Sequence, residues 1–231
     1  MARNKQLTQL IDALRAEVGH AVSVSVGVDN LPAIKQLIRR TQETLYDDFD
    51  WPHLRIQPTK ALAAGQRYYD FDTTLDYERI EEVVLWYSGQ PHMLERGIGF
   101  GDYAQFDSDS GIRSDPQLKW DVRHTGTKEQ LEIWPIPSSN SNKIQYQGIK
   151  KLNALTDLND TADLDDQLII LFAAAEILTR QKSQDAGAKL AAANARYLKL
   201  KGRTKGAGQI AVMGGGSDTE LLRGHTIIRV S

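Results

Sequence analysis

The stretch DLDDQLIILFAAAEILTR, residues 163–180, decides the fold because it has helical composition and is apolar almost all round. Three acidic residues, Asp163, Asp165 and Asp166, stand before the apolar run, where they suit the positive end of a helix dipole. Asp160 or Thr161 leads into this segment. A helix that is apolar on every face has to be surrounded by other elements. Residues 163–180 therefore predict the central buried helix, and we expect fully buried residues among Ile169, Leu171, Phe172 and Ile177.

The helical pattern continues from this segment to Arg203 through a run rich in alanine, which permits close approach between helices. Basic residues gather at its end, at Lys199, Lys201 and Arg203, where they match the negative end of the dipole. Gly187 interrupts the pattern. The sequence therefore predicts helical structure over Leu164–Arg203, either as one bent helix or as two.

Two helices are predicted at the start of the chain. Leu7–Val18 has apolar residues at helical spacing, and Gly19 follows as a C′ residue. Leu31–Phe49 carries a second apolar stripe; Asp29 or Asn30 can cap it, and Pro32 falls in its first turn. This helix has to end before Pro52, because the residue before a proline avoids helical conformation. The stretch VSVSVGV between the two helices predicts a short strand or an extended linker.

From Leu54 the apolar period changes to two, which predicts short strands. Ala64-Gly65 and Asp72-Thr73-Thr74 are the turn-formers between them, and residues 93–120 predict loops with a short helix. The last two strand-like stretches read as a hairpin, with Pro135 and Pro137 ending its first strand. The predicted strands are LRIQPTKAL (54–62), QRYYDF (66–71), RIEEVVLWY (79–87), KEQLEIWPIPSS (128–139) and NKIQYQGIKK (142–151).

Together these elements predict an α+β fold. The N- and C-terminal helices form a helical bundle, residues of about 54–150 form a β-rich insertion, and an extended C-terminal arm follows. We expect one folded domain over residues 1–202 and the arm over 203–231.

Composition excludes several classes of protein. The chain has 231 residues, 41% of them hydrophobic and 25% charged, with a net charge of −2, which is typical of a soluble globular protein and not of a dedicated nucleic-acid binder. No apolar run reaches the about 18 residues of a membrane span. The N-terminus reads as an amphipathic helix, not a signal peptide. Cysteine is absent, which excludes disulfides and thiolate chemistry and fits assembly in a reducing cytoplasm.

No catalytic or metal-binding motif is present. The histidines lack metal-ligand spacing, and the acidic loop Asp107–Gly111 has no acidic residue at the twelfth position of a calcium loop, which is Leu118. The glycines of GIGFGD (97–102) and GGGSDTE (214–220) form no phosphate-binding pattern and predict flexible loops. The five histidines are His20, His53, His92, His124 and His225.

The best catalytic or metal candidate is the group formed by Asp47, Asp48, Asp50 and His53. Three carboxylates at a helix C-terminus oppose the dipole, so they are unfavourable unless they are used. The alternative is a solvated helix end, an interface or a channel lining. We favour the alternative and predict no enzyme activity, no cofactor and no metal site.

The C-terminal stretch RTKGAGQIAVMGGGSDTELLRGHTIIRVS, residues 203–231, combines many glycines with side chains that prefer burial. Such a segment, costly to order alone, is suited to ordering on a partner, and the alternative is a frayed terminus. Its basic residues exceed its acidic ones. We expect partner contacts from Arg203, Lys205, Leu221, Leu222, Arg223, Ile227, Ile228, Arg229 and Val230.

Four stretches, read in order, resemble the head-to-tail adaptor (connector) proteins of tailed bacteriophages. The resemblance covers Leu31 to about Arg203. It rests on an aromatic before Trp-Pro, a Gly followed by a Tyr strand and an Asp-rich turn, a Pro-x-Pro turn with a Tyr on the next strand, and a closing helix. The stretches are LYDDFDWPHLR (45–55), AGQRYYDFDTTLDYERIEEVV (64–84), LEIWPIPSSNSNKIQYQGIKKLNAL (131–155) and DDQLIILFAAAEILTRQ (165–181).

The resemblance implies a structural protein of the virion neck, assembled in the host cytoplasm into a ring, commonly of twelve copies. Such a ring lies below the portal, receives the tail or tail-completion proteins, and extends the DNA channel without specific DNA binding. It also implies that the nine C-terminal residues above bind the portal. Two alternatives stay open: a stopper or tail-completion ring lower in the neck, and an accessory virion enzyme that uses Asp47 and Asp48 or the 107–109 loop.

Overall fold

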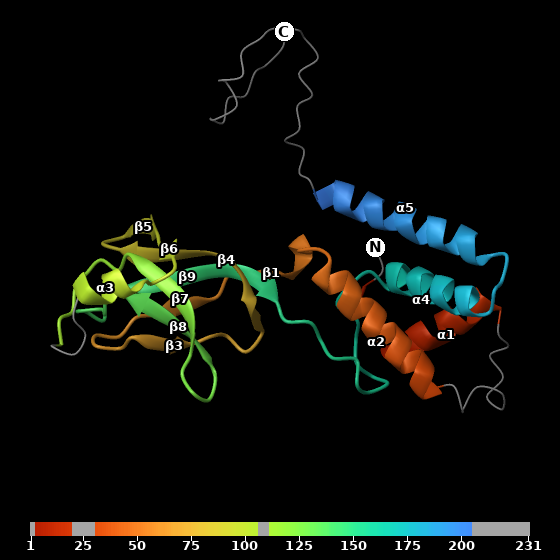
Figure 1. Ribbon diagram of the computed structural model, residues 1–231, viewed down its shortest axis with the longest axis horizontal. Helices are drawn as coiled ribbons and strands as arrows, with labels where there is room; N and C mark the ends of the chain where they lie inside the picture. Colours follow the sequence, from red (N-terminus) through yellow and green to blue (C-terminus); the bar gives the residue numbers. More distant parts are fainter. Residues whose placement is uncertain (1–2, 20–30, 106–110, 205–231) are drawn as a thin grey trace, which may run out of the picture.

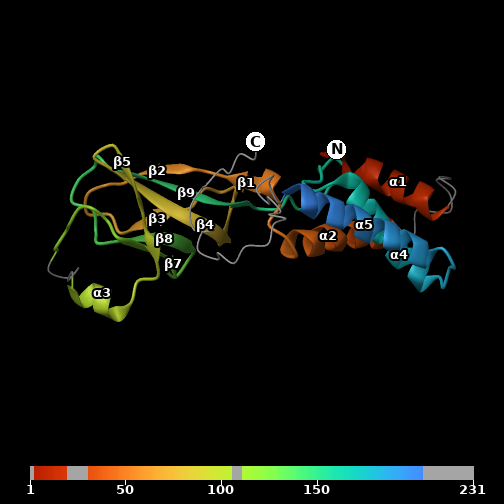
Figure 2. The same ribbon diagram turned by 90° about the horizontal axis from the view of Figure 1, so that it is seen from above.

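The computed structural model describes residues 3–19, 31–105 and 111–204. Apart from α3 (Phe100–Gln105), the helices lie at one end of an elongated molecule, and both β-sheets lie at the other end together with α3 (Figure 1). The view from above shows the same division (Figure 2). The predicted mixed α+β class is confirmed.

The helical end is organised around α4, which packs against α1, α2 and α5. Apolar side chains from all four helices, together with Trp51 and Leu54, form one buried core. The apolar stretch 163–180 therefore lies at the centre of this end, as its composition predicts. The four helices are α1 (Leu7–Val18), α2 (Leu31–Asp47), α4 (Asp166–Arg180) and α5 (Ala186–Thr204).

Two helix ends follow their local sequence. Gly19 ends α1 with a φ of 77°, a left-handed conformation that glycine adopts without strain. Asp165 caps α4: its Oδ1 accepts a hydrogen bond from the Leu168 backbone N–H at 2.9 Å. The Asp29 or Asn30 cap and the VSVSVGV stretch (22–28) lie outside the described residues.

The long C-terminal helical pattern is two helices. The helical conformation is interrupted between Arg180, where α4 ends, and Ala186, where α5 begins. Lys182 in this link has a φ of 56°. Gly187 lies inside the first turn of α5 and marks no kink. Because α5 folds back against α4, the alanine-rich stretch packs along the central helix.

Burial along α4 is uneven. Ile169 is fully buried, whereas Phe172 is half-buried, with its ring centroid 6.4 Å from that of Tyr197. Phe172 lines a shallow groove between α2 and α5. The expectation of fully buried residues among Ile169, Leu171, Phe172 and Ile177 is met by Ile169, whereas Phe172 and Ile177 are only partly buried.

The β-rich end contains two sheets whose facing side chains form a second core. One sheet has the order β1-β9-β4-β5, with β2 also paired to β9; the other has the order β3-β8-β7-β6, in which only β6 and β7 run parallel. A 3-10 turn (Pro52–Leu54) precedes β1, and α3 (Phe100–Gln105) is the short helix predicted in the 93–120 region. The strands are β1 (Arg55–Ile56), β2 (Thr59–Ala61), β3 (Tyr68–Asp70), β4 (Leu75–Tyr87), β5 (Gln90–Met93), β6 (Glu95–Arg96), β7 (Lys119–His124), β8 (Glu129–Trp134) and β9 (Lys143–Lys150).

The predicted hairpin between β8 and β9 is wrong. β8 pairs with β3 and β7, and β9 pairs with β1, β2 and β4, so the two strands belong to different sheets. Pro135 and Pro137 end β8 as predicted. Neither proline can donate a ladder hydrogen bond, and the chain uses this segment to cross from one sheet to the other.

Candidate functional site

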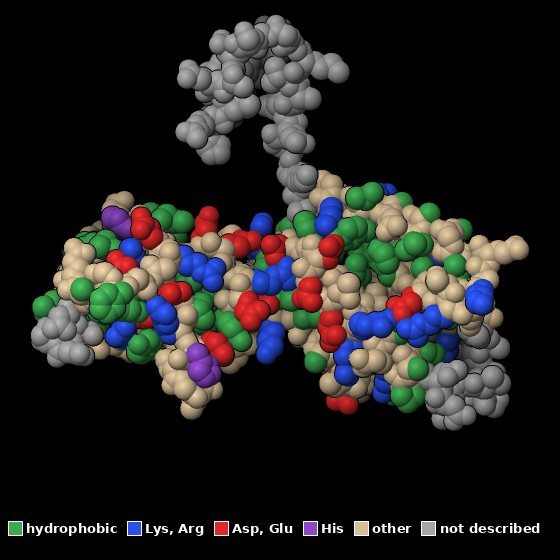
Figure 3. Space-filling model, viewed as in Figure 1, with side chains coloured by type: hydrophobic (Ala, Val, Ile, Leu, Met, Phe, Trp, Pro, Cys, Tyr) green, Lys and Arg blue, Asp and Glu red, His purple; other side chains and the backbone are tan. Residues whose placement is uncertain are grey.

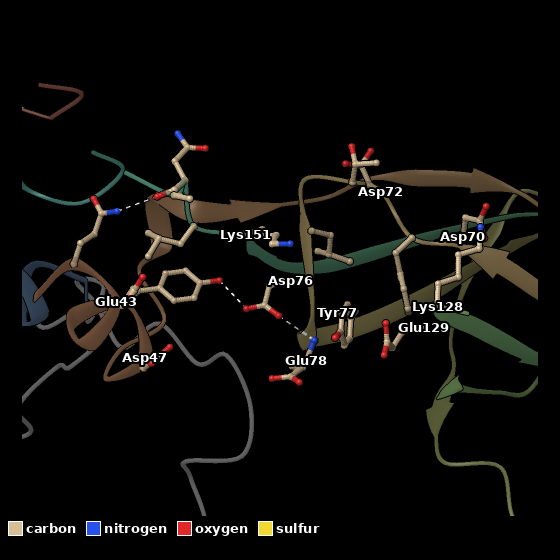
Figure 4. A pocket seen from close by; sticks show the side chains of 18 of the residues that line it. Glu43, Asp47, Asp70, Asp72, Asp76, Tyr77, Glu78, Lys128, Glu129 and Lys151 are labelled. Carbon is tan, nitrogen blue, oxygen red and sulfur yellow. Dashed lines mark hydrogen bonds and ion pairs between the residues drawn. The ribbon is translucent and has the colours of Figure 1, made fainter. Parts of the chain in front are cut away.

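A cleft of about 740 Å³ lies where α2 meets the β-rich end. One wall is α2, and the opposite wall is the start of β4 with the turn before it (Figure 4). The start of β8 and the segment after β9 complete the lining. The lining residues are Arg39, Gln42, Glu43, Tyr46, Asp47, Asp70, Phe71, Asp72, Thr73, Leu75, Asp76, Tyr77, Glu78, Lys128, Glu129, Lys151, Leu152, Asn153 and Ala154.

Tyr46 joins the two walls of the cleft. Its hydroxyl lies 2.8 Å from Oδ2 of Asp76 on β4 and 3.0 Å from the carbonyl oxygen of Lys150. Burial, reinforced by the Asp76 carboxylate, raises the pKa of the Tyr46 hydroxyl. The phenol therefore stays protonated and donates its hydrogen bond across the cleft.

Arg79 fixes the end of α2 against β4. Its guanidinium carbon lies 4.4 Å from the Tyr46 ring centroid, and its Nη1 donates to the Tyr46 carbonyl oxygen at 2.7 Å. Its Nε donates to Oδ1 of Asp50 at 2.9 Å. The Arg79 side chain thus stacks on an aromatic ring, donates to a backbone carbonyl oxygen and pairs with a carboxylate at the junction of the two ends.

The turn that positions the acidic wall forms as its sequence predicts. Asp72 accepts hydrogen bonds from the Thr74 backbone N–H at 2.9 Å and from the Thr74 hydroxyl at 2.5 Å. These contacts lower the pKa of the Asp72 carboxyl. An aspartate that bonds the backbone two residues on is a common way to start a turn.

The cleft is strongly acidic. Seven carboxylates line it, against three basic side chains, and an adjoining hollow of about 650 Å³ adds further carboxylates while sharing Asp47 and Glu78 with it. Asp and Glu side chains gather, among basic ones, at the middle of the face in Figure 3. We call the carboxylates of both hollows the acidic surface: Glu43, Asp47, Asp48, Asp50, Asp70, Asp72, Asp76, Glu78, Glu81 and Glu129.

Only part of this negative charge is compensated. Asp50 pairs with Arg79, Asp48 with Lys201, Asp70 with Lys128, and Glu81 with Arg55. In the part of the chain that the structure describes, no ion pair with a basic side chain is formed by Glu43, Asp47, Asp72, Asp76 or Glu78.

Of the predicted candidate group, Asp47, Asp48 and Asp50 line the adjoining hollow together, whereas His53 does not line it. Asp48 and Asp50 face different basic partners. Nε2 of His53 lies 3.0 Å from the carbonyl oxygen of Asp163, and burial lowers the pKa of this imidazole. Within residues 3–19, 31–105 and 111–204, no group of three or more metal-ligand side chains is present.

The other sequence candidates are separated from the cleft or lie outside the described residues. His92 is on β5 and His124 ends β7, while His20, His225 and the acidic loop at 106–110 lie outside the described part. The GIGFGD stretch runs into α3, and Oδ2 of Asp102 accepts from the Gly99 N–H at 2.8 Å. This stretch forms a local turn followed by a six-residue helix, which is not the arrangement of a phosphate-binding loop.

The β-rich end contains a buried network of charged side chains that was not predicted from the sequence. Glu132 is fully buried and lies within 2.6 Å of Arg67 and 2.9 Å of Arg123, and the Tyr103 hydroxyl is 2.9 Å from its Oε1. Arg67 also stacks over the rings of Tyr103 and Trp134. Every partner is satisfied, so the network stabilises the sheet and leaves no open position for a ligand.

Of the nine predicted partner-binding residues, only Arg203 lies within a described helix, in the last turn of α5. The other eight, from Lys205 to Val230, lie outside the described residues. The sequence predicted only the part of the acidic surface formed by Asp47, Asp48 and Asp50. The other carboxylates come from separate stretches of the chain, and they join this part only in the fold.

The fold and surface define a mixed α+β protein with an acidic cleft at the junction of its two ends. The family model described as SU10 adaptor protein matches residues 5–215. The match spans most of the chain, and the chain belongs to the SU10 adaptor protein family; it is a structural adaptor protein of phage and a virion component.

A comparison with curated proteins found no match. No helix in the described part of the chain is long and apolar enough to cross a membrane.

Proposed function

We propose that this adaptor forms a ring, expected to hold twelve copies, below the portal in the neck of the virion. The ring links the capsid vertex to the tail and extends the channel used in DNA packaging and DNA ejection. The observation that supports this proposal most directly is the adaptor family match over residues 5–215. Family membership also favours a structural role over an enzymatic one.

We further infer that α1, α2, α4 and α5 act as one helical bundle within a unit of residues 1–202. The shared core of these helices supports this arrangement. The β-rich part, inserted between α2 and α4, then projects from the bundle as a second contact surface. The elongated shape gives each copy two separate ends with which to meet different partners (Figure 1).

We infer that the C-terminal arm, residues 203–231, binds the portal. Its glycines allow it to follow a partner surface, and its apolar residues supply burial once ordered. Residues 225–230 suit addition as a strand to an exposed sheet edge, where backbone hydrogen bonds give affinity.

The experiment mixes the purified protein with portal rings and examines the product by electron microscopy. The proposal expects portal rings extended on one face by a second ring of this protein. A protein that stays monomeric and does not bind the portal would contradict it. A ring that binds only after another neck protein has been added would favour the stopper or tail-completion alternative.

A further inference from the structure

The groove between α2 and α5 leaves apolar side chains of the helical end in contact with solvent. It encloses about 460 Å³, and Phe172 of α4, which is only half-buried, lines it together with the exposed Leu190 of α5. Further along α5, Leu198 is 66% exposed. Figure 3 shows hydrophobic side chains gathered over this part of the molecule. Exposed apolar side chains that lie together mark a surface for protein contact.

The exposed face of α5 beside this groove carries no charge. Within residues 187–198, the exposed positions hold only Gly, Ala, Leu and Asn. The two basic side chains of this stretch are less exposed and form ion pairs inside the subunit, Lys189 with Glu17 and Arg196 with Asp165. A surface helix normally turns charged side chains to the solvent. We call the groove and the exposed positions of residues 187–198 the α5 surface.

The β-rich end presents exposed apolar side chains of its own. Phe100 at the start of α3 is 89% exposed, Met93 of β5 is 61% exposed, and Leu118 before β7 is also exposed. The helix α3 lies beside the start of β7, because Nζ of Lys119 is 2.9 Å from Oδ1 of Asp102. Figure 1 shows α3, β5 and β6 together at the end of the molecule away from α5. We call Met93, Phe100 and Leu118 the apolar tip.

The two surfaces complement each other. An aromatic side chain that is almost wholly exposed can fill an apolar groove, as the central contacts of interfaces do. The charges beside them are opposite: Glu95, whose backbone N–H donates to the Leu118 carbonyl oxygen, and Lys199, next to Leu198, are both exposed. Neither forms an ion pair with another described residue. Because the apolar tip and the α5 surface lie at opposite ends of one chain, they can meet only between copies.

We propose that the apolar tip of one copy docks on the α5 surface of the next copy. The contact joins two different surfaces, so each copy binds one neighbour through its tip and another through α5. Repetition of such a contact gives a closed ring when the rotation between copies allows closure. The proposal names the subunit interface of the ring proposed above and rests on that proposed function.

Two single substitutions test the contact without changing either core. Phe100→Ser alters the apolar tip and Leu198→Ser alters the α5 surface, and both side chains are mostly exposed. Sedimentation velocity measures self-association of the chain, alone and together with portal rings. We expect each variant to self-associate about tenfold more weakly than the unchanged protein. Leu158→Ser, which changes an exposed leucine outside both surfaces, should leave self-association unchanged.

A mixture of the two variants distinguishes this contact from any other interface. The Leu198→Ser chain keeps an intact apolar tip and the Phe100→Ser chain keeps an intact α5 surface, so one intact contact can form between them. We expect a dimer of the two different chains and no larger assembly, although each variant alone stays monomeric.

The absence of cysteine allows the same contact to be crosslinked. Gly101→Cys beside the tip and Ala195→Cys on α5 are placed in separate chains, which are mixed and oxidised, alone and on portal rings. We expect a disulfide between the two chains. The control mixture replaces Gly101→Cys by Thr127→Cys, an exposed position in the turn between β7 and β8, and should form the disulfide about tenfold more slowly.

Three results would overturn the proposal: self-association that neither single substitution weakens, a mixture of the two variants that stays monomeric, or equal crosslinking in the control mixture. If the first result came with intact rings on the portal, the proposed function would stand with a different subunit interface. A chain that self-associates neither alone nor on portal rings would refute both the ring and this contact. Loss of portal or tail binding by the variants of such a chain would assign the two surfaces to that partner instead.

Discussion

The guanidinium of Arg196 in α5 spans both carboxylate oxygens of Asp165, with Nε–Oδ1 at 2.7 Å and Nη2–Oδ2 at 2.8 Å. The same carboxylate caps α4 through the Leu168 backbone N–H. Asp165 is almost fully buried. One side chain therefore starts the central helix and fixes α5 against it.

Replacing Asp165 by alanine should destabilise the protein strongly. The change removes a helix cap and leaves the Arg196 charge without its partner, and together these should cost about 2–4 kcal/mol. Denaturant unfolding measures the loss. Asp12→Ala, at an exposed position on α1, serves as control and should change stability by less than about 0.5 kcal/mol. Equal effects of the two substitutions would show that the Asp165–Arg196 contact is unimportant.

Glu132→Gln should destabilise the β-rich end. The neutral amide keeps the shape of the side chain but leaves Arg67 and Arg123 without their shared buried carboxylate. Breaking such a pair costs about 3–5 kcal/mol. The measurement is thermal unfolding, with Glu95→Gln as the exposed control. A melting temperature unchanged from that of the control would contradict the role of Glu132.

Asp166 should make stability depend on pH. Burial raises the pKa of its carboxyl above the ordinary value, although the Lys5 backbone N–H donates to it. A carboxyl whose pKa is raised by folding adds stability below its unfolded pKa, and this contribution is lost as pH rises through the folded pKa. Asp166→Asn should therefore stabilise the protein at pH 7, and its advantage should shrink toward pH 3. Unfolding at several pH values tests this; an advantage that is equal at both ends of the range would contradict it.

The sequence predicts the helices well because their signals are local. The apolar stripe and Gly19 define α1, and the apolar run after Asp166 defines α4. The strands of the β-rich end are also predicted, but the pairing of β8 with β9 is not. Pairing depends on which sheet each strand joins, and a proline-rich link is compatible both with a hairpin turn and with a crossover.

The acidic surface as a whole could not be predicted for a related reason. Glu43 and Asp47 on α2 meet Asp76 and Glu78 on β4 only once the helix has packed beside the sheet (Figure 4). Gly148 shows the same limit: a Cβ there would lie 2.9 Å from Cδ1 of Leu75 and 3.0 Å from the Arg79 carbonyl oxygen. Such close approach is set by the tertiary fold and has no signature in the local pattern.

Duplex DNA should bind the isolated protein weakly at physiological salt. The net charge of the chain is −2, and the acidic surface would repel phosphates. Phosphate contacts would also retard DNA sliding through a channel, and they would make affinity fall steeply with salt. Fluorescence anisotropy with labelled duplex DNA measures the affinity. Nanomolar binding at physiological salt would favour a genome-binding or nuclease role over a channel role.

Deleting residues 214–231 should separate folding from attachment. Both cores are formed by residues 7–200 in the part of the chain that the structure describes, so the truncated protein should unfold at the same temperature as the full chain. Portal attachment should be lost, because the deletion removes seven of the nine residues expected to bind the portal, Leu221 to Val230. Ordering the segment costs about 1–2 kcal/mol per backbone residue, so only an extensive contact could hold it in place.

Co-sedimentation with portal rings measures attachment. A variant with Leu221, Leu222, Ile227 and Ile228 changed to serine distinguishes the contribution of the apolar contacts from that of the length of the segment. If the truncated protein joined portal rings with unchanged affinity, the portal-binding role of the C-terminal arm would be wrong.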